Sequence, residues 1–299
     1  MDTRRVLLVD AFTDEPLAGN AAGVVPDAEG LAADQMQAIA RELSVSETAF
    51  LTASGHADRR ARFFTPEREI DLCGHATVGA HAALRAEGEL SAGEHTLETE
   101  VGVVDVAVAD DGTVWMTQDA PEIREVGLSH ERVAEALGVD PEPLVELADE
   151  LPLAVASTGL PFLVVPATYL RVVGEADPDD DAVAELCASV DAEGLYLFTF
   201  DALASASTLH GRAFVPLAGI PEDPVTGTAS GAVAGYLRRY GAFDAMPEEL
   251  RLEQGHYVDR PGLVQVRARD EIQVGGSAVV SLEGTIGVPD AEDEDILEA

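Results

Sequence analysis

Two stretches of small residues each carry a side chain that could move protons. Residues 71–79, DLCGHATVG, place His75 at the start of an otherwise apolar run, and residues 222–231, EDPVTGTASG, place Asp223 before a second one. If both runs are helices, the unpaired N–H groups at their N-termini attract a carboxylate, and the small residues let it come close. His75 and Asp223 would then lie beside a bound anion as candidate proton carriers.

The threonines of the two runs allow two interpretations. Thr77 and Thr228 could donate hydroxyl hydrogen bonds to a ligand, or could serve with Thr226 as ordinary N-terminal caps. The Asp223-Pro224 pair is equally typical of an ordinary helix start. Both interpretations stay open on the pattern alone.

A third candidate is Glu47 in SVSETAFL (44–51), at the start of a strand of apolar and small residues. A carboxylate that enters a core must be exposed, be paired, or have a raised pKa. A strand-end glutamate in water is the simpler alternative.

The composition is strongly acidic. The chain has 299 residues, with 56 acidic residues against 18 basic ones and a net charge of −38, and every basic residue is arginine. Such a surface repels itself and needs screening by salt, which indicates a protein from a high-salt cytoplasm. The acidic segment 291–299 is expected to be a solvated end.

The same composition excludes several functions. Without lysine there is no Schiff base and no P-loop, and without a basic stripe nucleic acid is not an expected partner. The absence of C-x-x-C and H-E-x-x-H motifs gives a dedicated metal site little support. With no apolar run long enough for a membrane span, no signal peptide and two cysteines, we expect a cytoplasmic protein without a membrane partner.

Hydrophobic patterns predict alternating strands and helices. Helices are expected over DQMQAIARELS (34–44), over HATVGAHAALRAEG (75–88) up to Gly88, over DDAVAELCAS (180–189), and over TGTASGAVAGYLRRYG (226–241) up to Gly241. The segment VGVVDVAVADDGTVWMTQ (101–118) predicts a hairpin around Asp-Asp-Gly.

The chain also matches itself at an offset of 150 residues. Over residues 62–82, five positions are identical to those of 212–232, where about one or two would be expected by chance. The same offset places Cys73 on Asp223. We therefore predict two similar halves, each a curved sheet around a central apolar helix.

Several motifs together resemble the PhzF-like family of phenazine biosynthesis and run through nearly the whole chain in the family's order. They are VDAFTDEPLAGNAAGVV (9–25), ELSVSETAFL (42–51), RFFTPEREIDLCGHATVGAHAAL (62–84), GIPEDPVTGTASGAVAGYL (219–237), EQGHYVDRP (253–261) and VGGSAVV (274–280).

The resemblance implies the diaminopimelate epimerase-like fold, of class α+β. Its two pseudo-equivalent lobes are each a barrel-like mixed sheet around a central helix, with the site between them. We expect one lobe over residues 1–118 with 281–299, and the other over 119–280.

The resemblance also implies roles for single residues. Glu47 of the S-E-T motif would be the acid/base, with His75 and Asp223 as its catalytic partners. The residues expected to bind substrate are Asn20, Gly74, Thr77, Gly227 and Thr228. Alanine follows Asn20 where many relatives have proline, GHAT replaces the frequent GHPT, and Thr228 stands where many have serine.

These observations predict a cofactor-independent isomerase, by default a homodimer, that moves a proton on a small carboxylate-bearing substrate. An amino-acid epimerase on the same fold is the first alternative. A two-thiol mechanism is disfavoured for it because Asp223 stands opposite Cys73, and a carboxylate pKa near 4 matches poorly a thiol pKa of about 8.5. A non-catalytic small-molecule binding protein is the second alternative.

Overall fold

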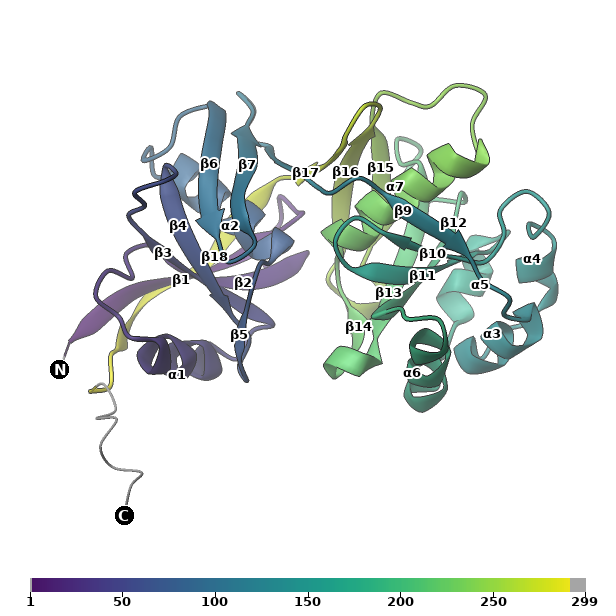
Figure 1. The fold of residues 1–299 in the computed structure, drawn as a ribbon, viewed down its shortest axis with the longest axis horizontal. Coiled ribbons are helices and arrows are strands. Elements are labelled where there is room, and N and C mark those ends of the chain that lie inside the picture. The colour runs from purple at the N-terminus through teal and green to yellow at the C-terminus, as the bar shows by residue number, and fades with distance from the viewer. Residues whose placement is uncertain (1, 291–299) are drawn as a thin grey trace, which may run out of the picture. The chain divides into compact units, whose positions relative to one another are not determined.

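The computed structural model describes residues 2–290, so the acidic segment 291–299 lies outside the described residues. The chain divides into two compact units (Figure 1). Unit 1 comprises Met1–Leu17, Ala21–Met116 and Ser277–Ala299, and unit 2 comprises Ala18–Asn20 and Thr117–Gly276.

Unit 1 is a mixed sheet with two helices. Its strands are β1 (Thr3–Ala11), β2 (Asn20–Val25), β3 (Glu47–Thr52), β4 (Arg59–Phe64), β5 (Glu69–Ile70), β6 (Gly93–Thr99), β7 (Gly102–Val108), β8 (Val114–Thr117) and β18 (Ala278–Gly287). Helix α1 (Ala33–Leu43) packs on β3 and β4, whereas α2 (Gly74–Ala86) contacts β1, β3, β7 and β18. Helix α2 is therefore the central helix of this unit.

Unit 2 has the same plan with additional helices. Its strands are β9 (Glu122–Glu125), β10 (Ala154–Ser157), β11 (Pro161–Pro166), β12 (Gly194–Thr199), β13 (Leu209–Val215), β14 (Ile220–Asp223), β15 (Leu250–Gln254), β16 (Gly262–Ala268) and β17 (Ile272–Gly276). Its helices are α3 (His130–Leu137), α4 (Glu142–Val145), α5 (Leu170–Glu175), α6 (Asp180–Ser189), the central α7 (Gly227–Tyr240), and the short 3₁₀ turns η1 (Pro216–Ala218) and η2 (His256–Val258).

The strand pairing confirms the predicted repeat. In unit 1, β2–β3 is parallel, β3–β4 and β4–β5 are antiparallel, β4–β6 is parallel, and β6–β7 and β7–β8 are antiparallel. Strands β11 to β17 of unit 2 pair in the same order and directions. Along the sequence, the two repeats run from β1 to β9 and from β10 to β18. The last strand of each repeat belongs to the unit of the other repeat, because β9 pairs with β10 and β18 pairs with β1.

Equivalent strands of the two units also carry equivalent side chains. Arg62 on β4 forms a two-pronged ion pair with Glu69 on β5, and Arg212 on β13 forms the equivalent pair with Glu222 on β14. Each guanidinium also lies over the phenylalanine two residues further along its strand, at 5.2 and 4.9 Å from the ring centre. The two-lobe α+β fold is therefore confirmed at the level of single contacts.

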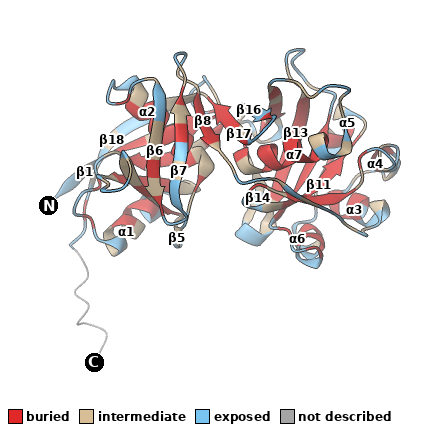
Figure 2. Ribbon diagram, turned by 45° about the horizontal axis from the view of Figure 1, so that its top comes forward, coloured by how far each residue is buried: buried red, intermediate tan, exposed pale blue. Residues whose placement is uncertain are grey.

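The central helices are buried because strands surround them (Figure 2). Residues Ala76–Leu84 of α2 are all buried, which explains a helix that is apolar on every side. In α7 a Cβ added at Gly231 would lie 2.2 Å from the Gln118 side chain, and one at Gly235 would lie 2.6 Å from Pro121. The small residues of α7 therefore allow close packing. Among residues 2–290, no helix is long and apolar enough to cross a membrane.

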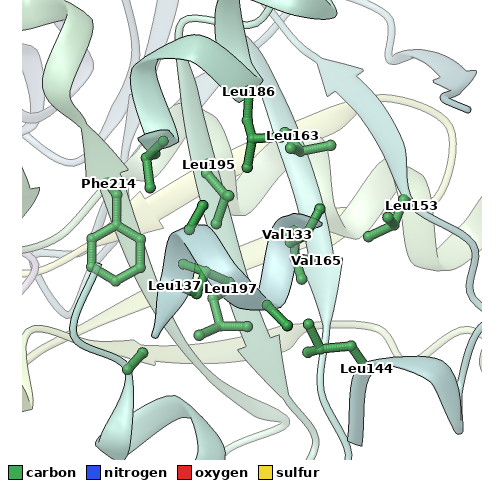
Figure 3. Packing of buried hydrophobic residues seen from close by; sticks show 14 of the residues in the cluster. Val133, Leu137, Leu144, Leu153, Leu163, Val165, Leu186, Leu195, Leu197 and Phe214 are labelled. Atoms are coloured by element: carbon green, nitrogen blue, oxygen red, sulfur yellow. The ribbon is translucent and has the colours of Figure 1, made fainter. Parts of the chain in front are cut away.

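Helices α3 and α6 build a second core in unit 2 (Figure 3). Val133 and Leu137 of α3 and Leu186 of α6 pack against β11 and β12. This layer comes mainly from residues 130–189, whose helices α3 to α5 the sequence patterns did not predict.

The predicted elements of the repeat are confirmed, but the offset of 150 that placed Cys73 on Asp223 is wrong at the central helices. Cys73 and Thr226 are the N-caps of α2 and α7, so Cys73 corresponds to Thr226. Asp223 pairs with Ala213 as Ile70 pairs with Phe63, because the loop before the second strand is longer in unit 2.

Helix α2 ends just before Gly88, whose φ is +75°, and α7 ends at Gly241, whose φ is +65°. The hairpin β7–β8 turns at Asp-Asp-Gly with Val108 opposite Val114. Strand β2 and the grouping of residues 18–20 with unit 2 were not foreseen.

Candidate active site

In unit 1, the start of α2 brings Cys73 and His75 beside Glu47 of β3. The Nε2 atom of His75 lies 3.3 Å from Oε2 of Glu47 and 3.4 Å from the hydroxyl of Ser46. Its Nδ1 atom lies 3.3 Å from Sγ of Cys73. These distances fit an Nε2–H directed towards the carboxylate and an Nδ1 that accepts from the thiol.

The partly buried position of these groups suits proton transfer. The side chains of His75 and Glu47 are 11% and 17% exposed, and Cys73 is buried. Glu47 begins β3, and its neighbours Thr48, Ala49 and Phe50 are fully buried, so the strand's register holds the carboxylate at the edge of the core. A carboxylate at such a point can meet a substrate yet is screened less than one in bulk water.

The first turn of α2 engages both hydrogen-bond donors of Thr77. The side chain is fully buried, and both its hydroxyl and its N–H donate to the carbonyl of Cys73, at 2.8 and 3.0 Å. Both donors of Thr77 therefore stabilise the helix start, and its expected role in substrate binding stays a prediction. Thr77 is not a cap, because the residue at the N-cap is Cys73.

Gly74 is the first residue of α2 and is half-buried. Apart from its chain neighbours and the helix's own backbone, no described atom lies within 4 Å of a Cβ built on it, so the space beside its Cα is open. The first N–H groups of a helix have no carbonyl of their own to bond, which is the general basis of anion binding at a helix start.

His81, further along α2, has a structural role. It is buried, and its Nδ1 lies 2.8 Å from the carbonyl oxygen of Thr77. Burial lowers the pKa of His81 to about 4. The imidazole therefore stays neutral near pH 7 and is not a candidate acid.

In unit 2, the segment before α7 holds the carboxylate of Asp223 between two donors. The buried amide of Asn20 donates to Oδ1 at 2.8 Å and to the Val225 carbonyl at 2.9 Å, and the Thr226 hydroxyl donates to Oδ2. Gln254 fixes the same turn, since its amide donates to the Asp223 carbonyl at 2.8 Å and its Oε1 accepts from the Thr226 N–H. The turn is thus rigidly positioned.

These contacts show which expected residues are brought together. Asn20 and Asp223 are in contact, and Gly227 is the first residue of α7, whereas Thr228 is half-exposed with its carbonyl accepting from Thr158. Thr226 occupies the N-cap, but its hydroxyl is directed to Asp223.

Two residues that touch these clusters, Ser46 and Gln254, were not predicted as site residues. Both lie inside motifs that carried the family resemblance, SVSET and EQGHY, and polar residues inside those motifs were the available signal.

Another histidine–carboxylate pair in unit 2 serves a different purpose. Glu253 accepts from the backbone N–H groups of Leu203 and Ala204, both at 2.8 Å, and lies 3.1 Å from Nδ1 of fully buried His210. Burial by itself raises the pKa of Glu253, but hydrogen bonds, including one from Ser207, outweigh it and lower that pKa. Its oxygens bind the loop at 203–204, so this pair is structural.

Known proteins resemble the chain over almost its full length. The PhzC-PhzF family, described as phenazine biosynthesis-like protein, matches residues 9–284. The chain is 35% identical over 290 residues to the uncharacterized isomerase YfhB of Bacillus subtilis, covering 95% of this chain and 96% of that one. It is 29% identical over 294 residues to the trans-2,3-dihydro-3-hydroxyanthranilate isomerase of Pseudomonas chlororaphis, covering 94% and 98%.

A solved structure agrees with this assignment. The crystal structure of the PhzF-family phenazine biosynthesis protein of Bacillus anthracis matches with a TM-score of 0.88 and 34% identity, covering 96% of this chain and 100% of that one. The family match, the relatives and the repeated two-lobe architecture point the same way, and the chain therefore belongs to the phenazine biosynthesis-like PhzC-PhzF family of isomerases.

Proposed function

We propose that this protein moves a proton between two carbon atoms of a small carboxylate-bearing substrate, with Glu47 as the acid/base. The observation that carries the proposal is the half-buried carboxylate of Glu47, 3.3 Å from His75 Nε2 at the start of a central helix. A group in this setting can take a proton from an acidic C–H bond and return it at another carbon.

His75 assists by holding Glu47. An Nε2–H directed at the carboxylate orients one oxygen, which leaves the other oxygen for the substrate. The neighbouring thiol of Cys73 and hydroxyl of Ser46 hold the imidazole plane in turn. This arrangement requires no organic cofactor or metal for the proton transfer.

The helix N-termini supply binding. A substrate carboxylate at Gly74 would meet unpaired N–H groups and the positive end of α2. The equivalent residues of α7, Gly227 and Thr228, with Asp223 and Asn20, are proposed to bind or orient substrate. Asp223 suits a positioning role because both its oxygens already accept hydrogen bonds.

The experiment is proton exchange in D₂O and concentrated KCl, followed by NMR on a panel of small amino and cyclic carboxylic acids. Trans-2,3-dihydro-3-hydroxyanthranilate heads the panel because the Pseudomonas chlororaphis relative isomerises it. Glu47→Gln should retain the fold and substrate binding but lose about 10²- to 10⁴-fold in exchange rate. Glu42→Gln, on the exposed face of α1, is the matched control and should exchange at the wild-type rate.

Two outcomes would change the assignment. Exchange that survives in Glu47→Gln removes Glu47 from the mechanism. Binding without exchange of any substrate in the panel favours the non-catalytic binding protein.

An amino-acid epimerase is the second candidate, favoured by the 3.3 Å contact between Cys73 Sγ and His75 Nδ1. A thiol beside an imidazole can be deprotonated readily and act as a base at Cα. This candidate predicts deuterium at Cα with loss of optical rotation, and exchange that disappears in Cys73→Ser.

We also propose that the protein works in the cytoplasm as a homodimer at high salt, since closed dimers are the commonest assemblies. Light scattering on the protein as it elutes from a sizing column in concentrated KCl measures the mass directly. A monomer mass would contradict the proposal.

A further inference from the structure

The segment before α7 contains a network of buried side chains whose donors and acceptors are fixed. Gln254, at the end of β15, is fully buried, and its Oε1 accepts from the N–H of Thr226 at 3.1 Å. Its Nε2 donates to the Asp223 carbonyl at 2.8 Å and to the Thr226 hydroxyl at 3.0 Å. Because a backbone N–H only donates and a carbonyl only accepts, the amide of Gln254 has a single allowed orientation.

This orientation decides where the proton of the Thr226 hydroxyl points. A hydroxyl has one proton and two lone pairs, and one lone pair here accepts from the Gln254 amide. The proton is directed to Oδ2 of Asp223. Oδ1 of the same carboxylate accepts from Asn20, whose amino group also donates to the Val225 carbonyl at 2.9 Å. Each carboxylate oxygen therefore faces a donor that the surrounding bonds hold in place.

Thr226 makes this contact in place of the usual contact of its position. It is the N-cap of α7, where a threonine oxygen normally accepts from an N–H of the first helical turn, but Thr226 makes no such bond. Ser129 and Asp179, the N-caps of α3 and α6, do make it. The hydroxyl of Thr226 therefore serves the Asp223 carboxylate and not the helix.

The backbone after β15 holds the network from both sides. Gly255 follows Gln254 with a φ of +85°, and a Cβ there would lie 2.2 Å from the carbonyl oxygen of Arg260, so only glycine fits. The guanidinium of Arg260 donates to the carbonyl of Gly19 at 2.9 Å, immediately before Asn20. This one segment therefore supports both donors of the carboxylate.

We propose that Gln254 is a positioning residue of this enzyme, which directs the Thr226 hydroxyl to Asp223 and so fixes the orientation of the carboxylate towards substrate. The proposal rests on the proposed function, because it requires Asp223 to bind or orient substrate. The hydrogen-bond network itself does not depend on that function. A small misplacement of an orienting group can cost up to about 10²-fold in rate.

The network is tested first, without an activity assay. Thr226→Val removes the hydroxyl and keeps the shape, whereas Gln254→Glu replaces the amide donor by an acceptor that competes with Asp223 for the hydroxyl proton. The readout is the ¹³C NMR signal of the Asp223 carboxyl carbon, assigned as the signal that disappears in Asp223→Asn. It should move in both variants and stay near its wild-type position in Thr226→Ser. Gln254→Met, which adds no charge, replaces Gln254→Glu if that variant does not fold. An unmoved signal in the folded Gln254 variant overturns the network.

The role in the reaction is tested by proton exchange at saturating substrate. The rate should fall by about 10- to 10²-fold in Thr226→Val and in the Gln254 variant, and Thr226→Ser should restore most of it. Because Gln254 acts through Asp223, its substitution should cause no further loss in the Asp223→Asn background. Losses that multiply in the double variant would show two independent effects and refute the positioning role.

Two controls remove the same groups elsewhere in unit 2. Thr199→Val deletes a fully buried hydroxyl that donates to the Thr168 carbonyl, and Gln273→Glu changes a half-buried amide on β17. Both should exchange at the wild-type rate. A moved carboxyl signal with undiminished exchange refutes the positioning role and retains the network. Exchange that persists in Glu47→Gln refutes the proposed function, whereas the NMR result on the network stands.

Discussion

Of the two equivalent arginine–glutamate pairs, the more exposed one serves as the control for a stability prediction about the more buried one. Arg62–Glu69 and Arg212–Glu222 have the same geometry in the two units, but they differ in exposure. The side chains of the first pair are 24% and 33% exposed, and those of the second pair are 8% and 10% exposed. The substitutions Glu69→Gln and Glu222→Gln remove the same charge from the same fold position.

We expect the two substitutions to lower the free energy of unfolding by amounts that differ several-fold. Breaking an exposed pair costs about 0.2–1 kcal/mol, because water solvates the remaining arginine. Breaking a buried pair costs about 3–5 kcal/mol, because an uncompensated charge stays in the core. Arg212 keeps two carbonyl acceptors, Val173 and Ala176, at 3.0 and 2.7 Å. We therefore place Glu222→Gln near the lower limit, at about 3 kcal/mol.

Urea unfolding at constant KCl measures both losses. With a urea dependence of about 3 kcal/mol per molar, Glu222→Gln should lower the midpoint of unit 2 by about 1 M, and Glu69→Gln should lower that of unit 1 by about 0.3 M or less. The single tryptophan, Trp115, lies in unit 1, and all five tyrosines lie in unit 2. Tryptophan fluorescence and tyrosine absorbance therefore follow the two units separately.

Two further measurements sharpen the result. Added KCl should reduce the effect of Glu69→Gln and leave that of Glu222→Gln nearly unchanged, because salt screens exposed charges far more than buried ones. Replacing both Arg212 and Glu222 by apolar residues should recover much of the loss, since no charge then stays buried. Equal midpoint shifts for the two single substitutions would refute the reasoning.

Three other predictions follow from burial and charge. Unfolded histidine binds a proton below about pH 6.5, whereas His81 in the folded state does so only below about 4, so the unfolded state gains protons first and stability falls as the pH falls through this window. The full loss in the free energy of unfolding is about 3 kcal/mol. Urea midpoints measured from pH 7.5 to 5 should decline less in His81→Gln than in exposed His56→Gln. Equal declines in the two variants would contradict the assignment of this pH dependence to His81. Burial raises the pKa of the Cys187 thiol to about 12, so a thiol reagent should label it only after unfolding, and mass-spectrometric detection of native labelling would refute its burial. Because the net charge is −38, the thermal midpoint should rise as KCl is increased towards molar concentration, and a midpoint independent of salt would contradict the high-salt interpretation.

The local elements of this fold could be predicted because their signals are local. Apolar runs ending at Gly88 and Gly241, each with a positive φ in the structure, marked the ends of the two central helices. Alternation around Asp-Asp-Gly marked the β7–β8 hairpin. The identities at an offset of 150 predicted the repeat because equivalent core positions in the two units need similar side chains, as Arg62 and Arg212 show.

The strand exchange between the units could not be predicted in the same way. Strands β9 and β18 each follow one half in sequence and pair with the other, and no short pattern encodes a partner so distant. The grouping of Asn20 with Asp223, 203 positions later, has the same cause. Such pairings are decided by the total burial that the whole sheet achieves.

The candidate site shows the same division between local and distant information. Residue types alone identified Glu47, His75 and Asp223 as groups able to carry protons, and the family resemblance gave Glu47 its expected role. Only the tertiary structure shows that the Thr77 hydroxyl donates to the Cys73 carbonyl at the helix start, and that Glu47, Cys73 and His75 form one cluster. The physical reason is that hydrogen-bond distances depend on a few ångströms between β3 and α2, and packing sets that separation.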